Sequence, residues 1–188
     1  TRMLLASVPT MTPPPARAVP EGAPRLLGQA VSKTYVSRDW RGRARHTDAL
    51  KDASLALRGG ETVGVVGESG SGKSTFARCL IRLIDPTQGR IHWGADEVAE
   101  LPERRLRPLR HRVQVVFQDP LGSLNPRMTI GATVGHGLQN HYPQRAAEHR
   151  DLVMQMLERV GLTPASFYYD KFPHQFSGGQ RQRVVIAR

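Results

Sequence analysis

Residues 67–75 decide the fold, and they read Gly67-Glu68-Ser69-Gly70-Ser71-Gly72-Lys73-Ser74-Thr75. This stretch fits G-x-x-x-x-G-K-[ST], a pattern whose glycines let backbone N–H groups approach phosphate oxygens. The apolar, β-branched run at 61–66 predicts a strand buried on both faces. A helix is expected from Lys73 to about Ile84, and an anion would satisfy the free amides at its start. The sequence therefore predicts a phosphate-binding loop between a strand and a helix.

Two side chains of this loop point to a nucleotide with magnesium. Lys73 would meet the β- and γ-phosphates as a point charge, and the Ser74 hydroxyl would ligate Mg²⁺. A glycine-rich turn without a ligand is the alternative. All nine residues of 67–75 are therefore candidate contacts of ATP.

Composition and charge are those of an ordinary globular chain. The 188 residues are 39% hydrophobic and 23% charged, which excludes a collagenous or wholly disordered protein. No run approaches the roughly 18–20 apolar residues of a membrane span, and the first thirty residues lack a signal-peptide pattern. The single Cys79, with apolar helical neighbours, predicts a buried, inert thiol. The net charge of +11 is spread along the chain, so we expect no nucleic-acid partner.

The rest of the chain predicts an α/β fold with a mainly parallel sheet. An amphipathic helix is expected at 150–160, ended by Gly161. Six of the fourteen prolines lie in residues 9–24, which predicts an extended linker. Besides 61–66, strands are expected at 27–36, 53–57, 89–94 and 113–117.

Two further features follow the loop. Gln118 comes directly after the expected strand at 113–117, where α/β sheets place ligands, although an ordinary strand exit would look the same. Near the end, Ser177-Gly178-Gly179-Gln180 precedes an apolar helical run. Ser177 can cap that helix while the glycines expose its first amides, which predicts a second anion site or a plain helix cap.

Together the loop, Gln118 and residues 177–180 resemble the ATP-binding cassette (ABC) ATPases, from about Leu26 to Arg188. The resemblance implies an α/β P-loop NTPase core of the RecA-like type, an antiparallel β subdomain and a helical signature subdomain at about 119–180. It also implies that 67–75 is the Walker A loop and that 177–180 is the signature.

The resemblance assigns roles to further residues. Gln118 becomes the Q-loop residue, which senses Mg²⁺ and serves catalysis together with Lys73. Tyr35 falls where the family places an aromatic ring that stacks on adenine, with a plain strand residue as the alternative. Phe176 stands before the signature where Leu is usual.

Three segments narrow the resemblance to the dipeptide, oligopeptide and nickel import ATPases: residues 117–120, 123–129 and 172–174. This implies an ATP-binding subunit that couples ATP hydrolysis to peptide uptake at the cytoplasmic face of a bacterial plasma membrane. The implied partners are a second cassette in a head-to-tail dimer, transmembrane permease subunits and, indirectly, an extracytoplasmic substrate-binding protein. Import of nickel or another small solute, a non-transport ABC ATPase and a P-loop kinase or switch are the alternatives.

The two ends of the chain suggest a protein in which two ATP-binding cassettes are fused in one polypeptide. Residues 1–9 are similar to the C-terminal segment of the partner ATPase in such importers, and 10–25 form the linker to a cassette at 26–188. The family expects a Walker B Asp, a catalytic Glu, a D-loop and a switch His after the signature, so we expect the cassette to stop before the Walker B strand. The 188 residues alone are therefore expected not to hydrolyse ATP.

Overall fold

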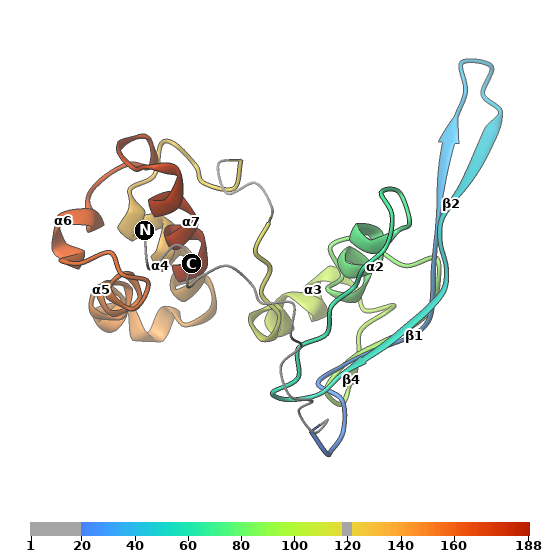
Figure 1. Cartoon of the computed structure of the whole chain (residues 1–188), viewed down its shortest axis with the longest axis horizontal. Helices are drawn as coiled ribbons and strands as arrows, with labels where there is room; N and C mark the ends of the chain where they lie inside the picture. The colour runs from blue at the N-terminus through green and yellow to red at the C-terminus, as the bar shows by residue number, and fades with distance from the viewer. Residues whose placement is uncertain (1–19, 118–121) are drawn as a thin grey trace, which may run out of the picture. The chain divides into compact units, whose positions relative to one another are not determined.

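The computed structural model describes residues 20–117 and 122–188. The chain divides into two compact units, 1–101 and 102–188 (Figure 1). The tail expected at 1–9, most of the linker and Gln118 lie outside the described residues. No helix in the described ranges is long and apolar enough to cross a membrane.

The first unit is built on a four-stranded sheet in which every pair of strands is antiparallel. Its order is β2-β1-β3-β4, with β1 (Leu26–Arg38) in contact with both β2 (Ala44–Leu57) and β3 (Gln88–Trp93). The short β4 (Asp96–Glu97) pairs with β3. These strands confirm the ones expected at 27–36, 53–57 and 89–94. β2 begins earlier than expected because its polar first half continues the ladder with β1.

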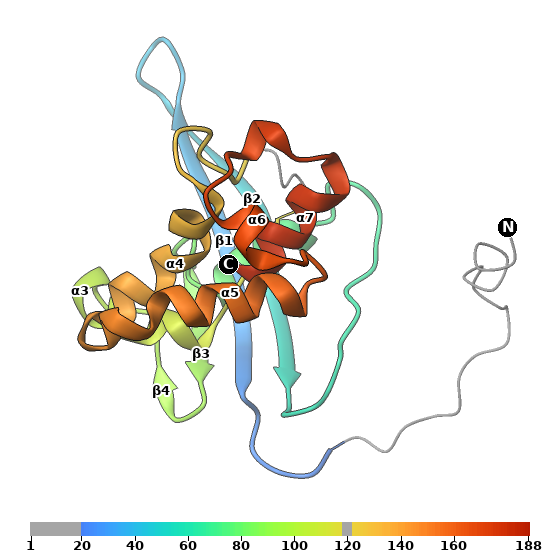
Figure 2. The same ribbon diagram turned by 90° about the vertical axis from the view of Figure 1, so that its left-hand side faces the viewer.

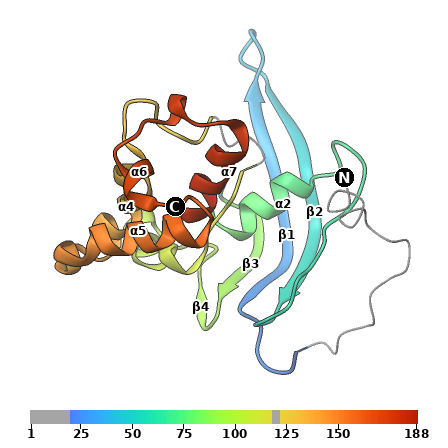
Figure 3. The same cartoon turned by 60° about the vertical axis from the view of Figure 1, so that its left-hand side comes forward.

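Helix α2 (Lys73–Leu80) lies across one face of β1 and β2 (Figure 3). It buries Phe76, Cys79 and Leu80, and the indole Nε1 of Trp93 donates to the Leu80 carbonyl at 2.9 Å. The Cys79 thiol is fully buried, as expected, and desolvation by burial raises its pKa.

The helix ends at Leu80 rather than near Ile84, because Arg82 leaves the helical region with φ +52°. This places the buried Arg82 guanidinium against the chain after β4. Its Nε donates to the Val98 carbonyl at 2.7 Å, and its Nη2 to the Leu101 carbonyl at 2.9 Å. Two main-chain oxygens are thereby satisfied by one side chain at the end of the unit.

The buried strands expected at 61–66 and 113–117 were wrong for this structure, since both segments are irregular. Val66 is 91% exposed and Val116 is 63% exposed. A strand exists only through hydrogen bonds to a neighbouring strand, and no described residues pair with either segment. For the same reason the mainly parallel sheet was a wrong prediction for the described residues.

The second unit is helical. Its main helices are α4 (Ile130–His141), α5 (His149–Arg159), α6 (Ala165–Tyr169) and α7 (Gly178–Ala187), which lie together in Figure 1. A common core of apolar side chains joins them. Shorter turns of helix are α3 (Glu103–Leu106), η1 (Arg107–Arg112), η2 (Pro143–Glu148) and η3 (Pro173–Gln175). The helix expected at 150–160 is confirmed as α5, with Val153 and Leu157 fully buried, and Gly161 ends it with φ +75°.

A close approach sets the packing of α4 on α6. A Cβ on Gly131 would lie 2.6 Å from two atoms of the Tyr169 ring, so the ring occupies the place of a side chain. Gly137, six residues further along the same helix, has room, since the nearest atom to its Cβ would be the Arg188 carbonyl oxygen at 3.9 Å.

Gly131→Ala should therefore destabilise the protein, because overpacking costs about 1–3 kcal/mol and outweighs the gain in helix propensity. Gly137→Ala is the matched control and should raise the free energy of unfolding by up to about 1 kcal/mol. Urea unfolding of the complete protein, followed by circular dichroism, measures both. Equal stabilisation by the two substitutions would show that the Tyr169 ring does not cover Gly131.

Candidate functional site

The loop at 67–75 enters α2 through Gly72, which has φ +91° and stands at the N-cap. A side chain there would be strained by this backbone conformation. It would also collide with the neighbouring strand, since a Cβ on Gly72 would lie 2.6 Å from the Ala49 carbonyl oxygen of β2. Glycine at this position therefore lets the start of α2 lie directly against β2.

The Lys73 side chain turns back over the loop. Its ammonium donates to the carbonyl oxygens of Gly67 at 2.8 Å and Glu68 at 2.5 Å, and to the Ser71 hydroxyl at 3.3 Å. The loop is closed further by the Ser71 N–H, which donates to the Glu68 carbonyl at 3.2 Å. A positive charge is thus held at a defined point beside the first turn of α2.

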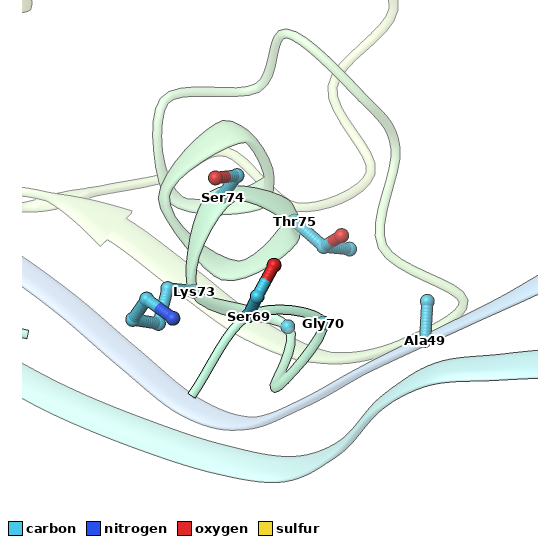
Figure 4. Close-up of a pocket in the computed structure, with 7 residues that line it drawn as sticks. Ala49, Ser69, Gly70, Lys73, Ser74 and Thr75 are labelled. Carbon is cyan, nitrogen blue, oxygen red and sulfur yellow. The ribbon is translucent and has the colours of Figure 1, made fainter. Parts of the chain in front are cut away.

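A pocket of about 480 Å³ opens at this point (Figure 4). Figure 4 shows Ser69, Lys73 and Thr75 gathered around the start of α2, with Ala49 contributed by β2. The first turn of α2 contains no acidic residue, and no described side chain caps it. Its N–H groups and helix dipole therefore favour an anion in the pocket. The lining residues are Ala49, Ser69, Gly70, Gly72, Lys73, Ser74 and Thr75.

One side chain that lines the pocket can serve as a ligand of Mg²⁺. Ser74 lines the pocket and is exposed, and a hydroxyl oxygen is a hard ligand of the kind that Mg²⁺ accepts. Mg²⁺ commonly binds one or two protein oxygens while phosphate oxygens and waters complete the octahedron. A single protein hydroxyl is therefore compatible with a magnesium ion brought in by a nucleotide.

Tyr35 lies outside this lining. It stands on β1 opposite Thr47, it is 44% exposed, and the Lys33 ammonium lies 5.2 Å from its ring centroid. The neighbouring strand does contribute to the pocket through Ala49, two residues beyond Thr47 on β2. The role of Tyr35 toward adenine stays a prediction, since no contact joins its ring to the pocket.

The residues of the second expected anion site form the start of α7 in the second unit. The Ser177 hydroxyl accepts from the Gln180 N–H at 3.3 Å, and the Gln180 Oε1 accepts from the Ser177 N–H at 2.9 Å. This capping box begins the helix. A Cβ on Gly178 or Gly179 would meet nothing within 4 Å, so the helix start is open to a ligand.

Phe176, just before α7, anchors the start of this helix in the helical core. It is buried in the helical core, with its ring centroid 5.5 Å from that of Tyr168. The substitution of Phe for the usual Leu is thus accommodated by an aromatic neighbour. Gln118, expected to sense Mg²⁺ as the Q-loop residue, lies outside the described residues.

The sequence analysis did not identify Ala49 as a residue that lines the pocket. Its contribution to the pocket depends on β2 running behind the loop, and Ala49 falls at an irregularity of the β1–β2 register, between the pairs Lys33–Leu50 and Thr34–Asp48. No local pattern marks such a position, because it is defined by the close approach of two segments.

Comparison with known proteins places this geometry in a family. The family model described as "ABC transporter" matches residues 50–188. The chain is 49% identical over 144 residues to the peptidoglycan transport ATP-binding protein YejF of Agrobacterium fabrum, covering 76% of this chain and 26% of the relative. It is 45% identical over 141 residues to the oligopeptide transport ATP-binding protein OppF of Salmonella typhimurium, covering 74% of this chain and 42% of the relative. The chain therefore spans less than half of either relative.

A solved structure supports the same family assignment. The ATP-binding cassette MJ0796, in a dimeric post-hydrolysis state bound to ADP and Pi, superimposes with a TM-score of 0.71 and 31% sequence identity. The match covers 86% of this chain and 67% of that one. It confirms the expected α/β P-loop class, with an antiparallel sheet and a helical unit. The chain belongs to the ABC transporter family, among its ATP-binding proteins.

Proposed function

We propose that this chain is the nucleotide-binding part of an ABC importer, in which ATP binding and hydrolysis drive the uptake of peptides. The observation that carries the proposal is the Lys73 ammonium, held by loop carbonyls at the uncapped start of α2 in a pocket. The substrate class is supported by relatives named for oligopeptide and peptidoglycan transport.

The geometry suggests how a polyphosphate would enter. Lys73 has three N–H donors, and the longest of its three bonds, at 3.3 Å, goes to the Ser71 hydroxyl. A phosphate oxygen can replace this weak bond while the two carbonyl bonds keep the ammonium in place. The lysine would then meet the phosphate in a preorganised position, at little cost in side-chain entropy.

Mg²⁺ is proposed to be held by the Ser74 hydroxyl, with Gln118 as a further ligand on the family resemblance. When bound, the ion would neutralise charge on the phosphate oxygens. Lys73 contributes to the same charge compensation, and Tyr35 is proposed to stack on adenine. The partial exposure of Tyr35, at 44%, supports that last role.

We also propose that Ser177-Gly178-Gly179-Gln180 closes over ATP bound to a second cassette, in a head-to-tail pair. The open start of α7 and the dimeric state of the MJ0796 cassette support this arrangement. Transmembrane permease subunits, and indirectly a substrate-binding protein, complete the proposed assembly, with the cassettes at the cytoplasmic face of the plasma membrane.

The second cassette is proposed to belong to the same polypeptide. Nearly equal matched lengths cover 26% of YejF but 42% of OppF, so YejF is substantially longer and has room for another cassette. The tail at 1–9, the linker at 10–25 and the cassette from 26 onward fit that organisation.

Lys73→Ala should reduce ATP affinity at least about tenfold, since it removes a charge-assisted contact worth about 1.5–3 kcal/mol. Lys51→Ala is the matched control, because Lys51 is an exposed lysine paired with Asp48 outside the pocket. Calorimetric titration of the complete protein with ATP and magnesium measures both. Unchanged ATP affinity in the Lys73 variant would contradict the proposed phosphate contact.

The role of Ser177 is separable from its helix cap by comparing Ser177→Asn with Ser177→Asp. Both residues cap a helix well, so α7 should keep its stability, but the carboxylate would repel the phosphates of a partner's nucleotide. We expect the Asp variant to lose ATP turnover by roughly tenfold or more relative to the Asn variant. Equal phosphate release by the two variants would place the signature away from the nucleotide.

A further inference from the structure

The hairpin of β1 and β2 extends beyond the rest of its sheet. The last pair between β1 and β3 is Ser32–Gln88, and past it β1 pairs with β2 alone as far as Arg38–Ala44. Figure 2 shows this ribbon reaching past β3 and β4. We call residues 38–46 the hairpin tip. An isolated two-stranded ribbon is only marginally stable in water. The extension therefore adds little to the stability of the sheet, which indicates another role for it.

The turn of the tip is an ordered structure. The Asp39 Oδ1 accepts the N–H groups of Arg41 at 2.9 Å and Arg43 at 2.8 Å, while the Asp39 N–H donates to the Arg43 carbonyl at 3.0 Å. Gly42 completes the turn with φ +74°. Asp39, the only acidic residue of the tip, thus uses its carboxylate to accept hydrogen bonds from the backbone of its own turn.

This turn carries an exposed tryptophan. The Trp40 side chain is 87% exposed, and the Arg41 guanidinium lies 4.4 Å from its ring centroid. The unit's other tryptophan, Trp93, is 2% exposed. The Trp40 ring therefore gives up the burial energy that a large aromatic side chain gains in a core.

Positive charge surrounds the ring. Arg38, Arg41, Arg43 and Arg45 are all exposed, and no described carboxylate forms an ion pair with them. The nearest acid on β2, Asp48, is bonded to Lys51 and to the Thr34 hydroxyl. These two groups, the Lys51 ammonium first, hold the pKa of the Asp48 carboxyl below its usual value. Its charge is therefore balanced locally, and the tip keeps a formal charge of +3 from its four arginines and Asp39.

We propose that the hairpin tip is a membrane contact that binds the anionic headgroups of phospholipids. Arginine pairs with phosphate through charge-assisted hydrogen bonds, and each basic side chain near an anionic leaflet adds attraction. Tryptophan prefers the water–lipid interface, where its ring is apolar and its N–H stays wet. One ring among four guanidiniums on a convex turn combines both properties.

Other partners fit the tip less well. A stable protein interface buries about 800 Å² of each partner, which is a large area for a nine-residue hairpin tip. A nucleic-acid module usually buries about 600–1,000 Å² or more, for which a nine-residue hairpin tip is small. The choice of lipid rests on the proposed function in one respect, namely that the protein works at a membrane.

Vesicle flotation of the complete protein, purified without permease subunits, tests the inference. Vesicles of phosphatidylcholine with 30% phosphatidylglycerol are compared with pure phosphatidylcholine at about 0.1 M salt, where the Debye length is roughly 10 Å. The tip variant is R38Q/R41Q/R43Q/R45Q. The charge-matched control is R104Q/R105Q/R127Q/R159Q, four exposed arginines of the helical unit. Emission of Trp40 is isolated by comparison with Trp40→Phe.

We expect binding to the anionic vesicles alone, a loss of about tenfold or more in the tip variant, and full binding in the control. Trp40 emission should shift to the blue with vesicles. Equal binding to both vesicle types, or an equal loss in the control, would overturn the inference. A DNA duplex that shifts Trp40 emission at a lower phosphate concentration than the vesicles would also overturn it, in favour of nucleic acid.

ATP titration of the same preparations separates this inference from the proposed function. The tip variant should bind ATP as the unaltered protein does, because its substitutions lie outside the loop at 67–75. Vesicle binding that fails while ATP binding persists rejects only the membrane contact. ATP binding that fails in the unaltered protein rejects the proposed function, whatever the vesicles show.

Discussion

The candidate site depends on the contact between the backbone of Gly72 and the Ala49 carbonyl of β2. A side-chain carbon at Gly72 would lie 2.6 Å from that oxygen, so only glycine lets α2 begin where it does. The position of Gly72 sets the first turn of α2, and with it the place of Lys73, Ser74 and the uncapped amides. The proposed phosphate binding therefore depends on the packing of α2 against β2.

Close approach recurs at the other end of α2. A Cβ on Gly28 of β1 would collide with a methyl carbon of Leu80, and the Trp93 indole donates a hydrogen bond to the Leu80 carbonyl. The buried Arg82 then ties the chain after the helix to two carbonyls. The helix that carries the site is thus held at its start by backbone contact and at its end by hydrogen bonds.

The candidate sites of the two units are arranged differently at the start of their helices. In the first, charge is delivered by a lysine that the loop's own carbonyl groups position. In the second, Ser177 and Gln180 satisfy one another, and an open pair of glycines leaves the helix start accessible. Both candidate sites lie at a helix N-terminus, where unpaired amides and the dipole favour an anion.

Much of this could be read from the sequence, because its signals are local. The loop at 67–75, the cap at Ser177, the helix ended by Gly161 and the buried Cys79 depend on residues adjacent in the chain or one helical turn apart. The expectations that failed concern the strands at 61–66 and 113–117. Their β-branched residues favour extended backbone, but a strand requires a partner that no local pattern provides. Ala49 in the pocket was likewise decided by tertiary contact. Residue type and spacing alone thus determined which groups can bind phosphate, whereas packing between distant segments decided where β2 closes the pocket and which apolar runs become strands.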